Sequence, residues 1–210
     1  MSSQPVEVAA PVSRVQRKRG RRVQEILATA AELFGERGYD AVSLDDVAER
    51  LDVTKGSLYY YFPGKDELAV AAIETLGADW TGRLERLAAT VEGSPHERLR
   101  ALLREHVAIA VGEYPAALRL FLVPSTWPAD PRERIKELRR RHDQVFRGVL
   151  EEGLASGDFA VTGVDTTLQC MHAAMAQAPL WCGGLESEAR ERALDELADT
   201  LMKLVAAAAQ

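Results

Sequence analysis

Cysteine is scarce in this sequence, which has only two in 210 residues, Cys170 and Cys182. Twelve positions along one straight helix correspond to about 18 Å, a separation that no disulfide spans. No apolar run approaches the roughly 20 residues that a membrane-spanning helix needs, and no apolar leader with a cleavage site opens the chain. These absences are typical of a reduced compartment, so we expect a cytoplasmic protein that binds no membrane.

Catalytic signatures are also missing. The sequence has no G-x-S-x-G, no Walker A loop, no H-E-x-x-H and no dinucleotide fingerprint. Its four histidines lie on four different predicted segments: His96, His106, His142 and His172. Histidines scattered in this way are more often surface or core residues than ligands, although the fold could bring them together around a metal. We therefore predict no enzyme, no cofactor and no metal site.

Aromatic residues make up 6% of the chain and hydrophobic residues 47%, with Ala and Leu frequent, which favours helices around a full core. Neither strand alternation nor a repeat of 20–50 residues is present. The fold class predicted from these features is all-α.

The net negative charge argues at first against a nucleic-acid partner. The chain carries −6 at pH 7, but residues 1–22 hold six cations against Glu7 alone, a net of +5, which leaves −11 for the remainder. A basic head on an acidic body suits a protein that touches DNA at one end. The basic run can lie along phosphates or enter the minor groove, and the alternative is a solvated charge cluster.

Residues 43–65, SLDDVAERLDVTKGSLYYYFPGK, predict two short helices joined by a tight turn. Ser43 and Asp46 form an N-capping pattern at the start of the first helix. Apolar residues then recur at i, i+3, i+4 and i+7, which is the stripe of one helix face (Leu44, Val47, Ala48 and Leu51). A turn at 52–53 leads to the second helix over 55–62.

Helical spacing gives this second helix two faces. One can pack on the preceding helix (Leu58, Tyr61 and Phe62), and the other faces solvent (Lys55, Gly56, Tyr59 and Tyr60). Exposed tyrosines beside a lysine are costly unless something flat and anionic docks there. A helix-turn-helix that places its second helix in the major groove of DNA supplies that partner. The alternative is a helical hairpin inside an ordinary α-domain with three core tyrosines.

The run VTKGSLYYYFPGKDEL, preceded by SLDDVAERL and by a helix ending in FGERGYDAVS, closely resembles the DNA-binding domain of the TetR family of bacterial transcriptional regulators. The resemblance covers about residues 19–76. It implies that Lys65 contacts a phosphate and that the helix starting there couples ligand binding to the spacing of two heads. The helix faces and the resemblance together predict a DNA-binding set, which comprises Arg19, Arg22, Ser43, Thr54, Lys55, Gly56, Ser57, Tyr59, Tyr60, Tyr61 and Lys65.

We predict three parts along the chain: a disordered basic arm (1–18), a DNA-binding helix-turn-helix domain (19–64) and a ligand-binding and dimerisation domain (65–210). Helical patterns in the third part run from Lys65 to about residue 92, then over 96–111, 115–123, 132–154, 165–181 and 186–208, with a loop at 124–131.

The last two helices are the predicted dimer interface, because both carry broad apolar stripes. The interface set comprises Leu168, Met171, Met175, Ala178, Leu194, Leu197 and Leu201. An intramolecular core must also take part of these faces. The resemblance favours a four-helix interface with two helices from each subunit.

A ligand pocket is predicted from aromatic and polarizable side chains of several body segments. The set comprises Trp80, His106, Tyr114, Phe121, Trp127, Phe146, Met171 and Met175, each of which could instead be plain core. The body resembles those of regulators of fatty-acid and sterol catabolism, which implies a hydrophobic or acyl-thioester effector.

These observations predict a homodimeric, ligand-responsive DNA-binding regulator, most simply a repressor that a small molecule releases from a palindromic operator. Two alternatives stay open. One is a constitutive DNA-binding protein without an effector pocket, and the other is a helical enzyme with an appended head.

Overall fold

The computed structural model describes residues 13–112 and 129–206, with side chains from residue 133 onward in the second range. These residues form helices and turns without any strand, and an isolated bridge joins Phe159 to Ala206. The helices are α1 (Arg14–Arg37), α2 (Leu44–Arg50), α3 (Lys55–Tyr59), α4 (Lys65–Thr90), α5 (Pro95–Gly112), α7 (Ala129–Ser156), α8 (Val164–Cys182) and α9 (Ser187–Met202). The all-α prediction is confirmed. Among the described helices, none has the length and apolarity required to cross a membrane.

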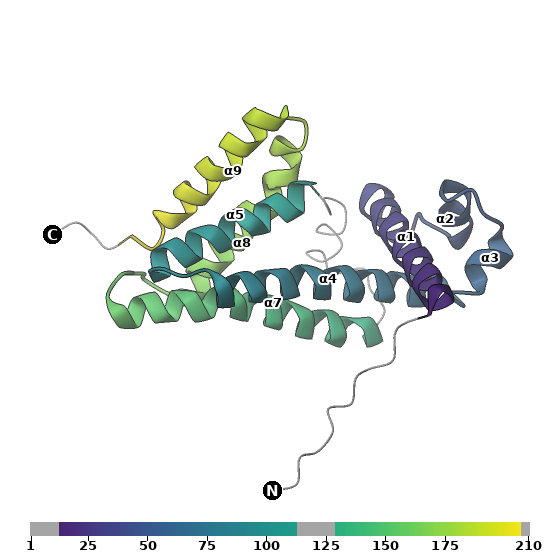
Figure 1. The fold of residues 1–210 in the computed structure, drawn as a ribbon, viewed down its shortest axis with the longest axis horizontal. Helices are drawn as coiled ribbons and strands as arrows, with labels where there is room; N and C mark the ends of the chain where they lie inside the picture. The colour runs from purple at the N-terminus through teal and green to yellow at the C-terminus, as the bar shows by residue number, and fades with distance from the viewer. Residues whose placement is uncertain (1–12, 113–128, 207–210) are drawn as a thin grey trace, which may run out of the picture.

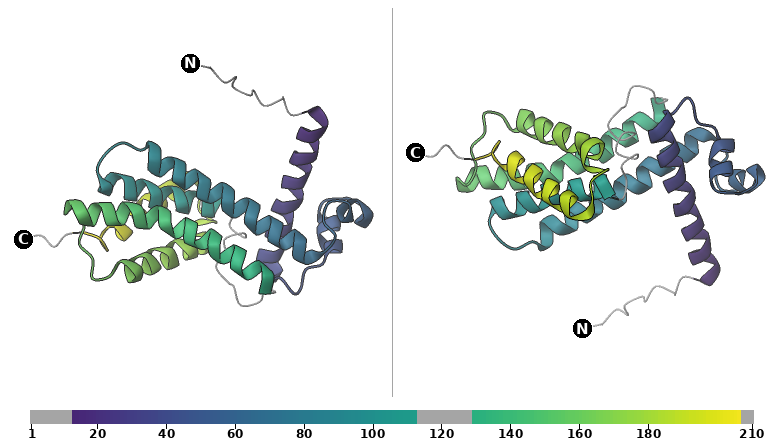
Figure 2. Two further views of the ribbon diagram at one scale, coloured as in Figure 1. Left: turned by 90° about the horizontal axis from the view of Figure 1, so that it is seen from below. Right: turned by 90° about the horizontal axis from the view of Figure 1, so that it is seen from above.

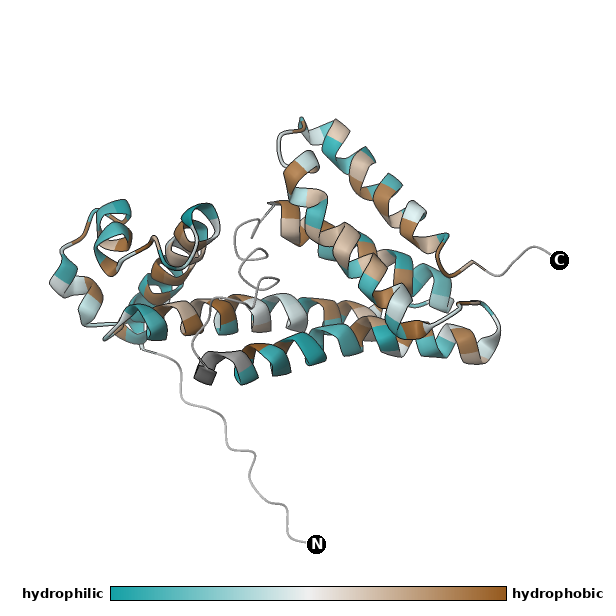
Figure 3. Cartoon of the chain, turned by 180° about the vertical axis from the view of Figure 1, so that it is seen from behind, coloured by the Kyte–Doolittle hydropathy of each residue, from teal (hydrophilic) through white to brown (hydrophobic). Residues whose placement is uncertain are grey.

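The helices separate into a small head and a larger body. Figure 1 shows α1, α2 and α3 at one end of the molecule and α5, α8 and α9 towards the other. Helix α4 runs from the head into the body, and α7 lies alongside it in all the views (Figures 1 and 2). Hydrophilic residues follow the outward side of α7, as its amphipathic sequence requires (Figure 3).

Two hydrophobic clusters form the core, and α4 contributes to both. Its first half packs with α1, α2 and α3 through Leu68, Ala72 and Leu76. Its second half places Trp80 and Leu84 in the body cluster. The head cluster thus extends beyond the predicted domain end at residue 64, since α1 and the two short helices α2 and α3 alone bury too little surface to be stable.

Helix α1 begins earlier than predicted. Ser13 and Gln16 form a capping box, in which Gln16 N donates to Ser13 Oγ at 3.2 Å and Ser13 N donates to Gln16 Oε1 at 2.9 Å. Residues 14–18, predicted as part of a disordered arm, are therefore helical, because this cap satisfies free N–H groups of the first turn. Residues 1–12 lie outside the described residues. The helix ends at Gly38, whose φ of 84° suits glycine.

Three other helix ends differ from the prediction by three residues or more. Helix α3 ends at Tyr59 rather than Phe62, and a tight turn follows in which Tyr61 N donates to Leu58 O at 2.9 Å. Helix α7 begins at Ala129, so residues 129–131 are helical instead of loop. Helix α9 ends at Met202, because the chain after it turns to pair Ala160 N with Val205 O at 3.0 Å. The predicted helix at 115–123 lies outside the described residues.

Candidate functional site

Local capping fixes the geometry of α2, the turn and α3. Ser43 N donates to Asp46 Oδ2 at 2.8 Å, and Asp46 N donates to Ser43 Oγ at 3.2 Å, as the sequence pattern predicts. The hydrogen bond from the Ser43 side chain holds the pKa of Asp46 below its usual value. In the turn, Asp52 takes a φ of 52°, a conformation that Asp tolerates better than most residues. Thr54 then caps α3 by accepting from Ser57 N at 3.3 Å.

Helix α3 has the two faces expected from its sequence. Leu58 and Phe62 are buried in the head cluster, whereas Tyr59 and Tyr60 keep 43% and 71% of their surface exposed. A Cβ atom on Gly56 would meet no atom within 4 Å. The fold alone therefore does not require glycine at this position.

Lys55 is held at the surface by an acid that the sequence analysis did not single out. Its Nζ donates to Asp45 Oδ2 at 2.6 Å and lies 5.7 Å from the centroid of the Tyr59 ring. The hydrogen bond to Asp45 raises the pKa of Lys55. The ammonium group is charged and exposed, but it must leave Asp45 in order to bind another anion.

Two hollows flank α3. The larger, of about 600 Å³, is lined by Val15, Lys18, Arg19, Arg21, Arg22, Glu25, Tyr60 and Tyr61. Its four cations outnumber the single acid, and Arg22 Nη1 contacts that acid, Glu25, at 2.5 Å. The smaller, of about 380 Å³, is lined by Asp40, Ala41, Val42, Ser43, Leu44, Tyr59, Gly64 and Lys65. Every member of the predicted DNA-binding set lines one of these hollows or lies at the exposed turn and helix between them.

Lys65 also has a structural role that the sequence did not indicate. Its Nζ donates to the carbonyl oxygen of Tyr39 at 3.0 Å and lies 4.3 Å from the centroid of the Tyr39 ring. The Tyr39 hydroxyl in turn contacts Asp66. Burial raises the pKa of Tyr39 above its usual value, and the Asp66 carboxylate raises it further. Lys65 thereby ties the loop between α1 and α2 to the start of α4.

In the body, five members of the predicted ligand-binding set come together but pack as core. Trp80, Phe146, Met171 and Met175 belong to the body cluster, and His106 is buried beside them. The Trp80 and His106 rings lie 4.7 Å apart, and the His106 and Phe146 rings lie 5.7 Å apart. The other three, Tyr114, Phe121 and Trp127, lie outside the described residues.

Three of the four histidines converge in this cluster. His106 of α5, His142 of α7 and His172 of α8 offer ligand atoms that all lie within 4.8 Å of one another. His142 Nε2 lies 3.2 Å from His106 Nδ1. Burial lowers the pKa of His106 well below its usual value and that of His142 to about 3. Because these histidines lie on three separate helices, the sequence alone does not predict that they are close together. The fourth histidine, His96, is exposed beside Phe159.

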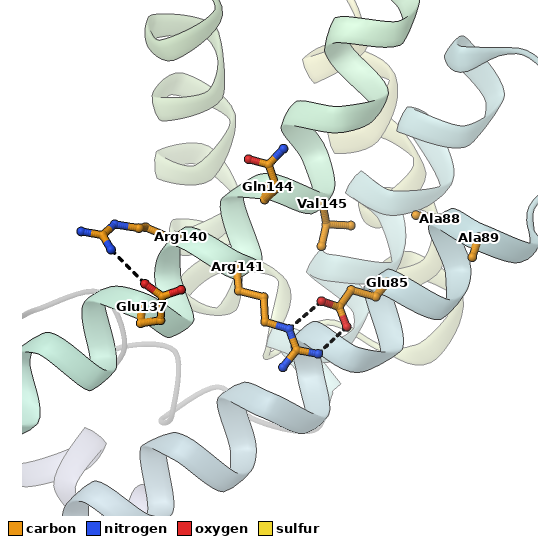
Figure 4. Close-up of a pocket in the computed structure, with 8 residues that line it drawn as sticks. All are labelled: Glu85, Ala88, Ala89, Glu137, Arg140, Arg141, Gln144 and Val145. Atoms are coloured by element: carbon orange, nitrogen blue, oxygen red, sulfur yellow. Dashed lines mark hydrogen bonds and ion pairs between the residues drawn. The ribbon is translucent and has the colours of Figure 1, made fainter.

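An open groove of about 690 Å³ lies between α4 and α7 (Figure 4). It is lined by Glu85, Ala88, Ala89, Glu137, Arg140, Arg141, Gln144 and Val145, none of which belongs to the predicted ligand-binding set. Arg141 donates to both carboxylate oxygens of Glu85 at 2.6 Å, and these hydrogen bonds lower the pKa of Glu85. The groove is thus crossed by a fixed ion pair.

The predicted dimer residues are not at the surface. Six of the seven are buried in the subunit's own core (Leu168, Met171, Met175, Ala178, Leu194 and Leu201), and Leu197 packs against it. The body needs these stripes to cover α5 and α7, so they are accounted for within one subunit, and their assignment to a dimer interface stays a prediction. The opposite side of α8, which we name the outer face of α8, is exposed and uncharged (Thr166, Cys170, Ala173, Gln177, Leu180 and Trp181). Leu180 and Trp181 are 61% and 48% exposed.

Two family models match the chain. The model described as bacterial regulatory proteins of the tetR family matches residues 26–72, and the model described as the tetracyclin repressor-like C-terminal domain matches residues 92–206. The first match covers α2, α3 and the smaller hollow, whereas most of the residues that line the larger hollow precede it on α1. The second match covers the body from α5 onward.

Individual proteins agree with these matches. The HTH-type transcriptional repressor KstR2 of Mycolicibacterium smegmatis is 31% identical over 146 residues, which cover 66% of this chain and 67% of that protein. The ketosteroid transcriptional regulator KstR2 of Mycobacterium tuberculosis superposes with a TM-score of 0.75 at 20% identity, over 89% of this chain and 95% of that one. The regulator FadR of Bacillus subtilis, solved with stearoyl-CoA, superposes with a TM-score of 0.68 at 19% identity, over 89% and 98%.

Proposed function

The chain belongs to the TetR family of bacterial regulatory proteins, and from this premise we propose that it is a ligand-responsive repressor that binds an inverted-repeat operator as a homodimer. One observation carries the DNA-binding part of the proposal. Helix α3 and the residue after it expose two tyrosines, a lysine and an unobstructed glycine backbone between two hollows, on a head whose core is formed by other side chains.

In the proposed complex α3 enters the major groove, and each hollow takes the backbone of one DNA strand. Arg19 and Arg22 neutralise phosphates on one side, while Lys65 and the Ser43 end of α2 face phosphates on the other. Tyr60 and Lys55 then reach base edges. In the free protein the Lys55 ammonium group pairs with Asp45. In this step it leaves Asp45 and binds DNA instead.

The outer face of α8 supports a symmetric dimer. Its small residues allow two copies of the helix to approach closely, and the exposed Leu180 and Trp181 are apolar surface that a second copy covers. A two-fold axis places the same patch of both chains in contact and sets the two heads on two half-sites. We propose this surface in preference to the interface residues predicted from the sequence, because most of those are buried in their own subunit.

The effector is proposed from the relatives. One solved relative is named for ketosteroid regulation and another holds stearoyl-CoA, which supports a hydrophobic or acyl-thioester ligand for this body. A hydrophobic ligand bound among Trp80, His106 and Phe146 would have to separate these closely packed side chains. This packing favours a second candidate, a constitutive DNA-binding protein.

Selection of binding sites from random duplexes tests the DNA-binding proposal. We expect an inverted repeat whose half-site centres are about one helical turn, or a multiple of it, apart. Enrichment of no sequence, or of a single unrepeated site, would contradict it.

Titration of the selected duplex complex with acyl-CoA, fatty acids and steroids then separates the two candidates. A releasing ligand with a coupling of about 1–3 kcal/mol lowers operator affinity about 5- to 150-fold. If no ligand in these classes changes the affinity, the constitutive protein is the better description.

A further inference from the structure

We propose that the body holds one divalent transition-metal ion, such as Zn²⁺ or Ni²⁺, bound by the imidazoles of His106, His142 and His172. The three side chains come from α5, α7 and α8 and bring their ligand atoms within 4.8 Å of one another inside the body cluster. Imidazole is the preferred ligand of zinc, nickel, copper and iron, and a poor one for magnesium or calcium.

The spacing of the first two ligands already fits an ion between them. Nε2 of His142 lies 3.2 Å from Nδ1 of His106. Zinc–nitrogen bonds of about 2.0–2.1 Å at a tetrahedral angle set neighbouring nitrogens about 3.4 Å apart. The third imidazole, His172, has to close in by at most about 1.4 Å, which a side-chain rotation supplies. Its side chain is 22% exposed, so it also lies where an ion can enter.

The surroundings of the ligands match those of metal sites. Thr81 Oγ1 lies 3.5 Å from Nδ1 of His142, where it can accept a hydrogen bond from the ring N–H, so that Nε2 carries the lone pair that a metal ion needs. Asp143 Oδ1 lies 3.4 Å from Nε2 of His172, so a carboxylate is at hand to balance the charge of the cation. The rings of Trp80 and Phe146 enclose the rest of the site.

A plain hydrogen-bonded trio is the competing explanation. In that case the 3.2 Å contact joins two neutral rings, and Nε2 of His172 has the Asp143 carboxylate as its partner at 3.4 Å. An ion would satisfy all three nitrogens at once. The lowered pKa values of His106 and His142 are compatible with ligation, because only the neutral ring binds metal.

An ion here would link α5, α7 and α8. It would also fix the rings that contact α4 at Thr81 and Trp80. Since α4 continues into the head cluster, occupancy would affect the spacing of the two heads. This last consequence rests on the proposed function, whereas metal binding itself does not. We therefore test binding on the free full-length protein, without DNA.

The experiment is a titration of chelator-stripped protein with Co²⁺, followed by its visible absorption and by calorimetry with Zn²⁺ and Ni²⁺. We expect one ion per chain, absorption bands of nitrogen-ligated Co²⁺, displacement by Zn²⁺ and no binding of Mg²⁺. The variants are His142→Leu and His172→Ala, and His96→Ala is the matched control because its ring lies outside the cluster.

Thr81→Val removes a residue that only contacts a ligand, so it should weaken metal binding about 10- to 100-fold. Removing one of the histidine ligands should weaken metal binding by more than that. Circular dichroism establishes that each variant is folded. The proposal is wrong if wild-type protein binds no ion at one per chain, or if binding survives in both His142→Leu and His172→Ala. If one variant fails to fold, the other decides: one-per-chain Co²⁺ binding that is lost in it and kept in His96→Ala supports the proposal.

Discussion

The head exposes two tyrosines at α3, whereas the aromatic side chains around the body's histidines are buried. In the head, Tyr59 and Tyr60 stand exposed beside Lys55, and the core beneath them is complete without them. In the body, Trp80 and Phe146 are buried against three imidazoles. An exposed aromatic group indicates a partner that is absent from the free chain. A buried polar cluster indicates a site that the fold has already built.

Helix α8 contains the same contrast on its two sides, and a charge on its inner side should have the largest effect. Met175→Glu places a carboxylate in the middle of the body core, where Met175 is fully buried. An unpaired buried charge costs about 3–5 kcal/mol, so the free energy of unfolding should fall by that amount in urea denaturation. A variant as stable as wild type would show that Met175 does not lie in the core.

A charge on the outer face of the same helix should leave the fold intact and break the dimer. Trp181→Glu introduces a carboxylate next to its own symmetry mate, so sedimentation should show monomers while circular dichroism stays unchanged. Operator affinity should drop to that of a single half-site. A variant that remains dimeric would move the interface to another face.

Substitutions on α3 should weaken DNA binding without any effect on the body. Lys55→Ala and Tyr60→Ala should each lower operator affinity about 5- to 150-fold, the range for one good base contact. Gly56→Leu should be worse, because its side chain meets open space in the free protein but blocks close approach to DNA. Arg192→Ala, at an exposed site on α9, is the control. Wild-type affinity in both Lys55→Ala and Tyr60→Ala would overturn the assignment of α3.

The basic hollow should be visible in the salt dependence of binding. Each phosphate contact contributes about 0.9 to the slope of log affinity against log salt, so the Arg19→Ala, Arg22→Ala double variant should flatten the slope by about 1.8. Fluorescence anisotropy at several salt concentrations measures it. An unchanged slope would mean that these cations on α1 remain in solvent when DNA binds.

The smallest effect should come from Asp45. Asp45→Asn removes the partner that holds Lys55 and one negative charge from the DNA-facing surface, so operator binding should tighten by less than about tenfold. The gain should shrink as salt rises. Weaker binding in this variant would show that the ion pair positions Lys55 for the complex.

The head could be predicted from the sequence because its determinants are local. The Ser43 and Asp46 cap, the turn before Thr54 and the two faces of α3 each depend on residues a few positions apart, and the structure places them as expected. The start of α1 was misplaced because the Ser13 and Gln16 cap went unnoticed, although it follows the same rule.

The body could be predicted only in outline. Apolar stripes on α8 and α9 correctly predicted helices, but a stripe does not say whether it faces its own subunit or a second one. Met175 and Leu201 proved to face inward. The convergence of His106, His142 and His172 depends on how α5, α7 and α8 cross, and no local pattern records that.

The central claim is that α3 reads the major groove of a symmetric operator, and methylation interference on the selected duplex tests it most directly. Methylation at guanine N7 modifies only the major-groove edge. The account predicts two patches of interference, symmetric about the operator centre and about one helical turn or a multiple of it apart. Interference confined to adenine N3 in the minor groove, or a single asymmetric patch, would contradict it.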